Sequence, residues 1–408
     1  RAAGGVSRSG RAADGRGRTV GQSTDADSSG RSGSYPAADV TFLLRLVSEA
    51  EALSLDRNLT EEPAAKERLI QSGARHYSEM ITPERAPTAA YQTIFERALA
   101  RHADRTGRDV ARLARALDAA VDGPITLCSL VRAGVPLGVV LTRTLRELGR
   151  DVEHFGVSIV RDRGIDSAAL AHVRARRPAE GVVFVDGWTG KGAIADELER
   201  SLASVWPTLA PRLVVLADPA GRAWLAASRD DWLIPSGILG GTVSGLVSRS
   251  ILNARLVGAD GFHASVRLDH LAAHDVSRRF ADTIALAATR ALATNASRDG
   301  PKPTLASTGH PGTDTDPDAA RARADAVIDA IAAEFGIANR NRVKPGLAEA
   351  TRAVLRRAPA RILVGAPDDE DLDGLRHLAA RADVPVERRG GALAPYRAIT
   401  LIADASGA

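Results

Sequence analysis

The sequence predicts an α/β protein built on a doubly wound, mostly parallel sheet and followed by a smaller α/β sandwich. Short, uniformly apolar runs indicate strands that are buried on both faces. Amphipathic stretches of helical length follow most of these runs, and this alternation is typical of parallel sheets covered by helices. The alternation occupies residues 124–218, and a similar pattern returns over 317–402.

The first unit covers residues 124–149, where an apolar run leads into the turn Arg132-Ala133-Gly134 and then into an amphipathic helix. The sequence then predicts, in order, a strand over 152–160, a charged turn over 161–166, a helix to about 177, a strand over 182–185, a helix near 193–204 and a strand over 212–218. Ligands of such sheets bind beyond the carboxyl ends of the strands. We therefore expect the turns after the first and third strands to form a site.

The segment VVFVDGWTGKGAI at 182–194 is the strongest candidate for that site. Gly187, Gly190 and Gly192 permit a tight turn, and the following helix would direct its unpaired N–H groups at an anion. Lys191 is one of only four lysines in the chain, and its compact ammonium suits a phosphate oxygen. The segment predicts a phosphate cradle, with a solvated turn as the alternative, and it does not have Walker A spacing.

Six segments together resemble the phosphoribosyltransferase-like proteins of tellurite-resistance and stress operons, a family often labelled cysteine protease StiP. They are SYPAADVTFLL (34–44), HYSEM (76–80), LVRAGVPLG (130–138), RDRGID (161–166), VDGWTGKGAI (185–194) and GTVSGLVSRS (241–250). The resemblance extends from residue 34 to about 295 and implies a type I phosphoribosyltransferase-like fold.

This resemblance implies an enzyme that uses phosphoribosyl pyrophosphate and Mg²⁺ to make or remodel a nucleoside-like metabolite. The residues that it assigns to catalysis are Asp186, Arg132, Lys191, Arg161 and Arg163. Those that it assigns to binding the donor are Ala133, Gly134, Asp186, Gly187, Thr189, Gly190, Lys191 and Gly192. Asp186 would hold the ribose hydroxyls and, through the substrate, the metal. Related enzymes have two adjacent acidic residues where this chain has Asp186 and Gly187, so ribose recognition would depend on one carboxylate.

Two further segments carry polar groups that could hold a nucleobase or a second phosphate. Their candidate residues are Ser244, Gly245, Ser248, Arg249, His76 and Glu79. The alternatives are a tight packed turn for the first four and a hydrogen-bonded structural cluster for the last two.

Cys128 is the single cysteine of the chain and therefore the only candidate for a thiol nucleophile. It lies in an apolar run, where a small buried side chain is the usual outcome, whereas a catalytic thiol needs a histidine partner and exposure. The sequence thus favours the transferase. It leaves two alternatives, a non-catalytic sensor of a phosphorylated ribose or nucleotide and, less favoured, a cysteine protease using Cys128.

The segment RNRVKPGLAEATRAVLRR at 340–357 resembles the RNA-binding element of PELOTA-type domains. The residues that this resemblance assigns to RNA binding are Arg340, Arg342, Lys344, Gly346, Glu349, Thr351 and Arg352. The family's guanine-reading asparagine is Ala348 here. We therefore expect contacts to RNA phosphates rather than sequence-specific reading.

Composition sets the remaining expectations. The predicted parts are a disordered tail over 1–33, a phosphoribosyltransferase-like domain over 34–295, a linker over 296–316 and a PELOTA-type RNA-binding domain over 317–405. One cysteine and no membrane-spanning apolar run predict a cytoplasmic protein without a membrane partner. The expected partners are the donor, an unknown base or nucleoside-like acceptor, and RNA; a homodimer is left open. The net charge of +4 suits anionic ligands.

Overall fold

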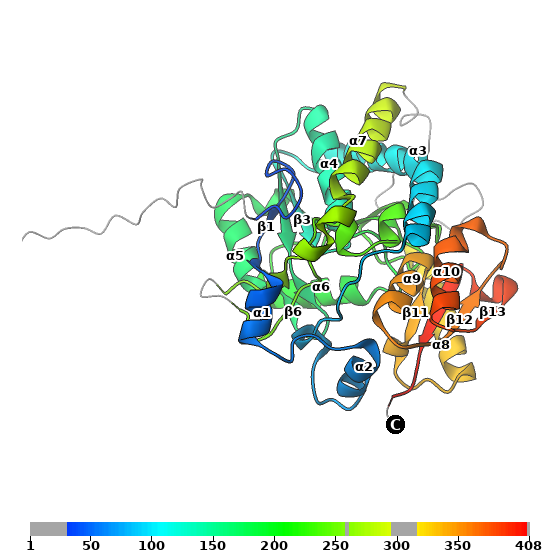
Figure 1. Ribbon diagram of the computed structural model, residues 1–408. Helices are drawn as coiled ribbons and strands as arrows, with labels where there is room; N and C mark the ends of the chain where they lie inside the picture. The colour runs from blue at the N-terminus through cyan, green and yellow to red at the C-terminus, as the bar shows by residue number, and fades with distance from the viewer. Residues whose placement is uncertain (1–30, 258–260, 295–315, 406–408) are drawn as a thin grey trace, which may run out of the picture.

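The computed structural model describes residues 31–257, 261–294 and 316–405 (Figure 1). The predicted tail over 1–33 lies outside the described residues except for its last three positions. The predicted linker over 296–316 lies outside them except for Asp316. Two β-sheets organise the described chain. One lies within residues 31–294, and the other lies within residues 316–405, which we call the C-terminal unit.

The larger sheet has six strands in the order β1-β4-β3-β7-β8-β9, and all neighbouring pairs are parallel. Its strands are β1 (Thr41–Phe42), β3 (Ile125–Leu130), β4 (Val152–Val157), β7 (Val182–Val185), β8 (Leu213–Ala217) and β9 (Leu225–Ser228). Strands β3 and β7 are buried at every position, because helices cover both faces. The predicted α/β class with a parallel sheet is confirmed.

The two faces of this sheet belong to separate cores. Ile125 and Leu127 of β3 pack toward α3 (Ala89–Ala120), α4 (Val135–Glu147) and α7 (Ser277–Ala293). These three helices lie against one another (Figure 1). Cys128 and Leu130 point the other way and pack with residues of α5 (Ser167–Arg176) and α6 (Ala193–Val205), as the two-residue period of a strand requires.

Smaller elements surround the ends of this sheet. They are β2 (Arg45–Val47) paired with β10 (Ala264–Val266), β5 (Ile159–Val160) paired with β6 (Gly164–Ile165), and the helices α1 (Glu49–Leu55) and α2 (Pro63–Gln71). Single 3₁₀ turns occur at η2 (Tyr77–Glu79), η3 (Ala179–Gly181), η4 (Pro235–Gly237), η5 (Gly241–Val243) and η6 (Asp269–His274).

The C-terminal unit is a four-stranded sheet in the order β11-β14-β12-β13, with only β12 and β13 parallel. Its elements are α8 (Pro317–Glu334), η7 (Arg340–Arg342), β11 (Val343–Pro345), α9 (Leu347–Arg356), β12 (Pro359–Val364), η8 (Glu370–Leu372), α10 (Asp373–Arg381), β13 (Val386–Arg388), η9 (Gly390–Leu393) and β14 (Ala398–Ile402). The alternating pattern predicted over 317–402 is present, but the sequence did not predict η7, η9 or β11, a three-residue strand ending in proline.

The C-terminal unit is attached to the first half by a buried carboxylate. Asp231 accepts hydrogen bonds from the backbone N–H of Leu347, at 2.8 and 3.0 Å to its two oxygens, and from that of Arg397 at 2.7 Å. Gly346 precedes this contact at φ 91°, a conformation that favours glycine. Helix α10 also contacts α3 (Figure 1). These contacts place α9 over the carboxyl ends of the parallel strands.

None of the helices in the described ranges is both long and apolar enough to cross a membrane.

Candidate functional site

The turns that follow β3 and β7 touch each other at the carboxyl edge of the sheet. A Cβ atom on Gly134 would lie 2.0 Å from the carbonyl oxygen of Val185, and one on Gly187 would lie 3.2 Å from that of Ala133. Only glycine at 134 permits this approach. The structure therefore brings together the two loops that the sequence predicts as one site.

The loop after β7 is partly closed by its own contacts. The N–H of Gly187 donates to the Asp186 carboxylate at 2.8 Å, and the N–H of Thr189 donates to the carbonyl of Ala217 at 2.9 Å. Two of the amides expected to hold a phosphate are thus already bonded. The carbonyl of Gly190 accepts from the Tyr396 hydroxyl at 2.8 Å, so the C-terminal unit covers the tip of the loop.

Asp186 is a poor match for the predicted metal role. Burial raises its pKa to about 7, although the Gly187 N–H and Arg352 act in the opposite direction. A carboxyl group that is half protonated near neutrality competes weakly for Mg²⁺. The residues that the structure describes contain no group of three metal-binding side chains. Magnesium dependence stays a prediction without a structural ligand set.

A cavity of about 300 Å³ opens between this edge of the sheet and the C-terminal unit, and we call it the basic cavity. Among the described residues it is lined by nine cationic side chains and two carboxylates. The cationic side chains are Lys66, Arg132, Arg161, Lys191, Arg249, Lys344, Arg352, Arg356 and Arg357, and the carboxylates are Asp186 and Glu349. Both parts of the chain line this cavity, because the last four of these cations belong to the C-terminal unit.

Several of these cations are held by backbone carbonyls rather than by carboxylates. Lys191 donates to the carbonyl of Arg340 at 2.7 Å, and Arg249 donates to the carbonyls of Tyr77 and Met80. Arg352 donates to the carbonyl of Ser236 at 3.2 Å. Carbonyl contacts satisfy hydrogen bonds but do not neutralise charge.

Burial and, to a smaller extent, neighbouring positive charges lower the pKa values of the lysines in this cavity. Burial, reinforced by neighbouring cations, lowers the pKa of Lys66 to about 5 and that of Lys191 to about 6. Burial and Arg357 lower the pKa of Lys344 to about 8, despite Glu349. An anion placed among these groups would favour their protonated forms.

The predicted RNA-binding element faces this cavity. Lys344 and Arg352 are 5% and 6% exposed, and Glu349 forms an ion pair with Lys344 at 3.6 Å. The guanidinium of Arg352 lies over the Trp188 ring, 4.7 Å from its centroid. The Thr351 hydroxyl is buried within α9. In this arrangement these side chains cannot reach an RNA, and RNA binding stays a prediction.

Arg340 and Arg342, from the same predicted set, lie at the surface with acidic partners. Arg340 pairs with Asp325 at 3.1 Å, and Arg342 pairs with Asp404 at 2.9 Å. Their charges are already balanced by carboxylates of the C-terminal unit.

The remaining predicted residues are divided between the cavity wall and packed turns. Arg161 and Arg249 lie over the Tyr77 ring, with 5.1 and 5.2 Å to its centroid, and line the basic cavity. Arg163 is half exposed and approaches Glu79 at 3.7 Å. The other residues predicted to hold a base or a second phosphate form hydrogen bonds within the protein. These hydrogen bonds join His76 to Ser78, Ser244 to Gly240, Gly245 to Ser277, and Ser248 to Ser265.

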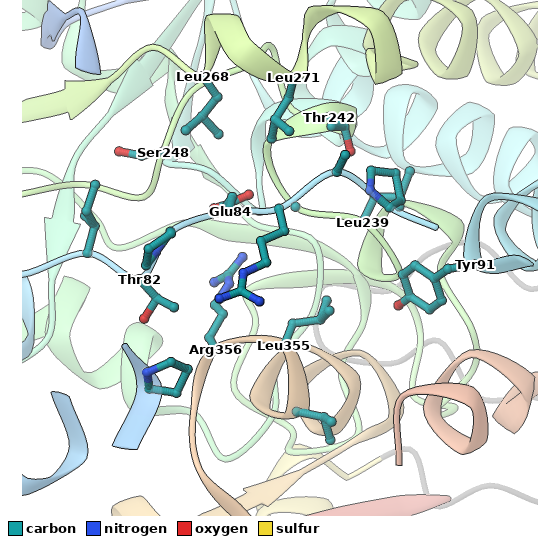
Figure 2. Close-up of a pocket in the computed structure, with 18 of the residues that line it drawn as sticks. Thr82, Glu84, Tyr91, Leu239, Thr242, Ser248, Leu268, Leu271, Leu355 and Arg356 are labelled. Atoms are coloured by element: carbon teal, nitrogen blue, oxygen red, sulfur yellow. The ribbon is translucent and has the colours of Figure 1, made fainter. Parts of the chain in front are cut away.

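A second cavity, of about 400 Å³, adjoins the first, and we call it the apolar cavity (Figure 2). Figure 2 shows Leu268 and Leu271 on one side and Leu355 and Arg356 on the other, with Glu84 between them. The two cavities share three lining residues, Lys66, Arg249 and Arg356. Sequence reasoning missed Glu84 and Lys66 as site residues. The rarity of lysine in this chain was the one signal that could have identified Lys66.

Cys128 is fully buried in the middle of β3. Its neighbours on the adjacent strands are Phe155 and Phe184. Burial raises the pKa of its thiol to about 12. The next residue, Ser129, forms a hydrogen bond of 2.7 Å with Nε2 of His154, but both side chains are buried as well. As the structure stands, none of these groups is open to a substrate.

A family model and a curated relative both assign this chain to the same family. The family model described as "Tellurite-like stress resistance cysteine protease StiP" matches residues 33–285, and the model described as "PELOTA RNA binding domain" matches residues 322–404. A curated relative, "Cysteine protease StiP" from Acinetobacter baylyi, is 45% identical over 383 residues, which cover 91% of this chain and 94% of the relative.

Similarity to solved structures is weak. A hypoxanthine phosphoribosyltransferase mutant from Trypanosoma cruzi, complexed with the product IMP, aligns with a TM-score of 0.24 and 16% identity, covering 33% of this chain and 72% of its own. An asparagine mutant at an invariant aspartic acid of HPRTs aligns with a TM-score of 0.23 and 16% identity, covering 31% and 74%. Scores this low do not assign a specific fold to this chain.

The predicted transferase function is therefore wrong. Both the matching family and the 45% identical relative are named for a cysteine protease, which the sequence interpretation placed below a phosphoribosyl pyrophosphate-dependent transferase. The assignment to a phosphoribosyltransferase-like family is likewise unsupported, whereas the predicted StiP and PELOTA resemblances are confirmed. The chain belongs to the StiP family of tellurite-like stress resistance proteins and carries a PELOTA RNA-binding domain.

Proposed function

We propose that this protein binds a ligand bearing a phosphate or carboxylate group in the basic cavity. The observation that supports this proposal is the set of nine cationic side chains that line about 300 Å³ with only two carboxylates. Three of the nine, Arg132, Arg161 and Arg357, have carboxylate partners outside the lining. Buried charges are costly unless they are paired. An anion would supply the pairing that the protein itself leaves incomplete.

The individual side chains suit this role in different ways. Arg352 presents a planar guanidinium that lies over the Trp188 ring, and a guanidinium can donate two parallel hydrogen bonds to a phosphate or carboxylate. Lys191 and Lys344 act as compact charges from the two parts of the chain that line the cavity. Asp186, with its pKa raised to about 7, repels an anion less than an ordinary aspartate would.

We expect pyrophosphate and citrate, titrated separately by calorimetry, to distinguish phosphate from carboxylate ligands. Arg352→Gln should weaken binding of the preferred anion at least tenfold, since hydrogen bonds to charged groups contribute about 1.5–3 kcal/mol. Because Arg352 lies over Trp188, tryptophan fluorescence should report the same titration.

The control is Arg174→Gln, which makes the same charge change on the exposed side of α5. Its affinity should equal that of the unmodified protein. Lys344→Met gives a second test of the cavity in case Arg352→Gln folds poorly. The proposal fails if neither anion binds, or if Arg174→Gln weakens binding as much as Arg352→Gln does.

A cysteine protease is the second candidate, because the family and its curated relative carry that name. Cys128 is the only cysteine and would have to be the nucleophile. It lies on the same face of β3 as Leu130, which lines the basic cavity. A thiol with a pKa of about 12 is almost entirely protonated at neutral pH, so catalysis would require the strand end to open.

Iodoacetamide labelling tests this requirement directly. We expect Cys128 to stay unlabelled in the native protein and to react fully in guanidinium chloride, because its sulfur is inaccessible. Rapid labelling of the native protein, together with casein cleavage that Cys128→Ala abolishes, would favour the protease. Cys128→Ala should otherwise retain anion binding.

A further inference from the structure

The apolar cavity combines an apolar wall with a cationic junction. Its wall includes Tyr91 of α3, Leu239 after η4, and Leu271 of η6, and Figure 2 shows these side chains around one hollow. Leu355 closes the opposite side and is 36% exposed. A volume of about 400 Å³ that combines an apolar wall with charged and polar side chains is typical of sites for small molecules.

Each carboxylate in the wall of this cavity lies beside a basic side chain, which for Glu49 is a histidine that is cationic only when protonated. Glu84 forms an ion pair with Arg132, a residue of the basic cavity. The other two pairs are at the rim, where Glu62 lies 3.2 Å from Arg85 and Glu49 lies 3.3 Å from His270. Glu84 is the carboxylate of this wall that also attracts Arg356, but it is already paired with Arg132.

Arg356 is the cation at this junction with the fewest partners. Its Nη2 atom is buried and has no hydrogen-bond partner. Among the described residues, its side chain forms no ion pair, whereas Arg249 donates to the carbonyls of Tyr77 and Met80 and Lys66 donates to the Thr82 hydroxyl at 3.2 Å. Burial next to Arg132 and Arg352 holds the pKa of Arg356 well below its ordinary value.

We infer that the apolar cavity binds a small amphipathic acid. Its apolar body lies between Tyr91, Leu239, Leu271 and Leu355, and its anionic group pairs with the guanidinium of Arg356. Charge complementarity selects this occupant over a neutral one, because an uncharged apolar molecule would leave the buried Nη2 of Arg356 without a hydrogen-bond partner. The inference goes beyond the proposed function, since it assigns a second ligand to a separate cavity.

Two fluorescent probes with the same apolar body test this inference. The anionic probe is 1-anilinonaphthalene-8-sulfonate, and N-phenyl-1-naphthylamine is its analogue without the sulfonate. We expect saturable binding of the anionic probe at one site. Arg356→Gln should weaken binding of the anionic probe about tenfold, equivalent to about 1.4 kcal/mol. The affinity for the neutral probe should be nearly unchanged. Arg174→Gln, which alters neither cavity, should change neither probe.

Leu355→Trp distinguishes ligand binding in the apolar cavity from ligand binding in the basic cavity. Leu355 lines only the apolar cavity, so the larger side chain should displace both probes and leave pyrophosphate or citrate binding intact. Arg356→Gln should also raise the melting temperature, because it removes a charge that lies next to Arg132 and Arg352. That readout shows that the variant is folded.

Equal loss of both probes in Arg356→Gln would overturn the inference. So would binding of the anionic probe that Leu355→Trp does not affect, since this would indicate a general apolar surface such as a protein interface. If pyrophosphate and citrate fail to bind while the probes behave as expected, only the proposed function of the basic cavity falls.

Discussion

Replacing Glu84 with glutamine should destabilise the protein by about 3 kcal/mol, the cost of removing one partner from a buried ion pair. Glu84 forms an ion pair with Arg132 and accepts a hydrogen bond from the N–H of Gly241 at 2.9 Å. Burial alone would raise its pKa, but Arg132 and Arg356 hold the pKa below its ordinary value. Without this carboxylate, Arg132 would lose its ion-pair partner, and the repulsion among the guanidinium groups of Arg132, Arg352 and Arg356 would increase.

The pH dependence of this effect has a definite sign. A carboxylate with a lowered pKa contributes its stability above the unfolded value, about 4.3 for glutamate. That contribution is lost as the pH falls through the lower folded value. The difference in the free energy of unfolding between the unmodified protein and Glu84→Gln, measured with urea, should therefore be largest at pH 7 and decrease toward pH 3.

The matched control is Glu62→Gln at the rim of the same cavity. Glu62 and Arg85 are 64% and 80% exposed, and exposed pairs contribute about 1 kcal/mol or less. Pyrophosphate should stabilise Glu84→Gln more than it stabilises the unmodified protein, because the added anion replaces the missing charge. Equal losses of stability in the two glutamine variants would contradict the role of Glu84 as counter-ion.

The architecture could be predicted where it depends on local pattern. Apolar runs without alternation identified β3 and β7, and glycine-containing turns marked the ends of these strands. The carboxyl ends of parallel strands share one edge of a sheet, so the proximity of Arg132 and Lys191 also followed. Both side chains line one cavity.

The completed site could not be predicted, because it depends on how the two halves dock. Lys344 and Arg352 match an RNA-binding pattern, yet their burial results from a contact with residues over 100 positions away, such as Ser236. Glu84 lies in an irregular segment with no motif. The transferase interpretation failed for a related reason. A loop shared by many proteins indicates a fold, whereas function depends on the site built on it.

The name of the family and the position of Cys128 place a physical constraint on any thiol mechanism. A nucleophilic thiolate needs a nearby cation, a helix N-terminus or a histidine base to lower its pKa. Cys128 has aromatic neighbours and a pKa raised to about 12. A protease reaction at this residue would therefore need a different conformation of β3.

Asp231→Ala is expected to release the C-terminal unit from the sheet. The Asp231 carboxylate accepts from the N–H groups of Leu347 and Arg397, and it is only 7% exposed. Leaving two buried N–H groups without an acceptor should cost about 3 kcal/mol. Because Lys344 and Arg352 reach the basic cavity only from the docked unit, binding of the preferred anion should weaken at the same time.

Amide hydrogen exchange at Leu347 and Arg397 is the most direct measurement. We expect protection at these two amides to fall sharply in Asp231→Ala, while amides of β3 stay protected, since the parallel sheet keeps its own hydrogen bonds. Asp231→Asn retains one acceptor oxygen, so the protection of these amides should be intermediate between that in the unmodified protein and that in Asp231→Ala. If anion affinity is unchanged while both amides exchange freely, the C-terminal cations do not contribute to the basic cavity. If affinity and protection fall together, docking of the two halves assembles the site.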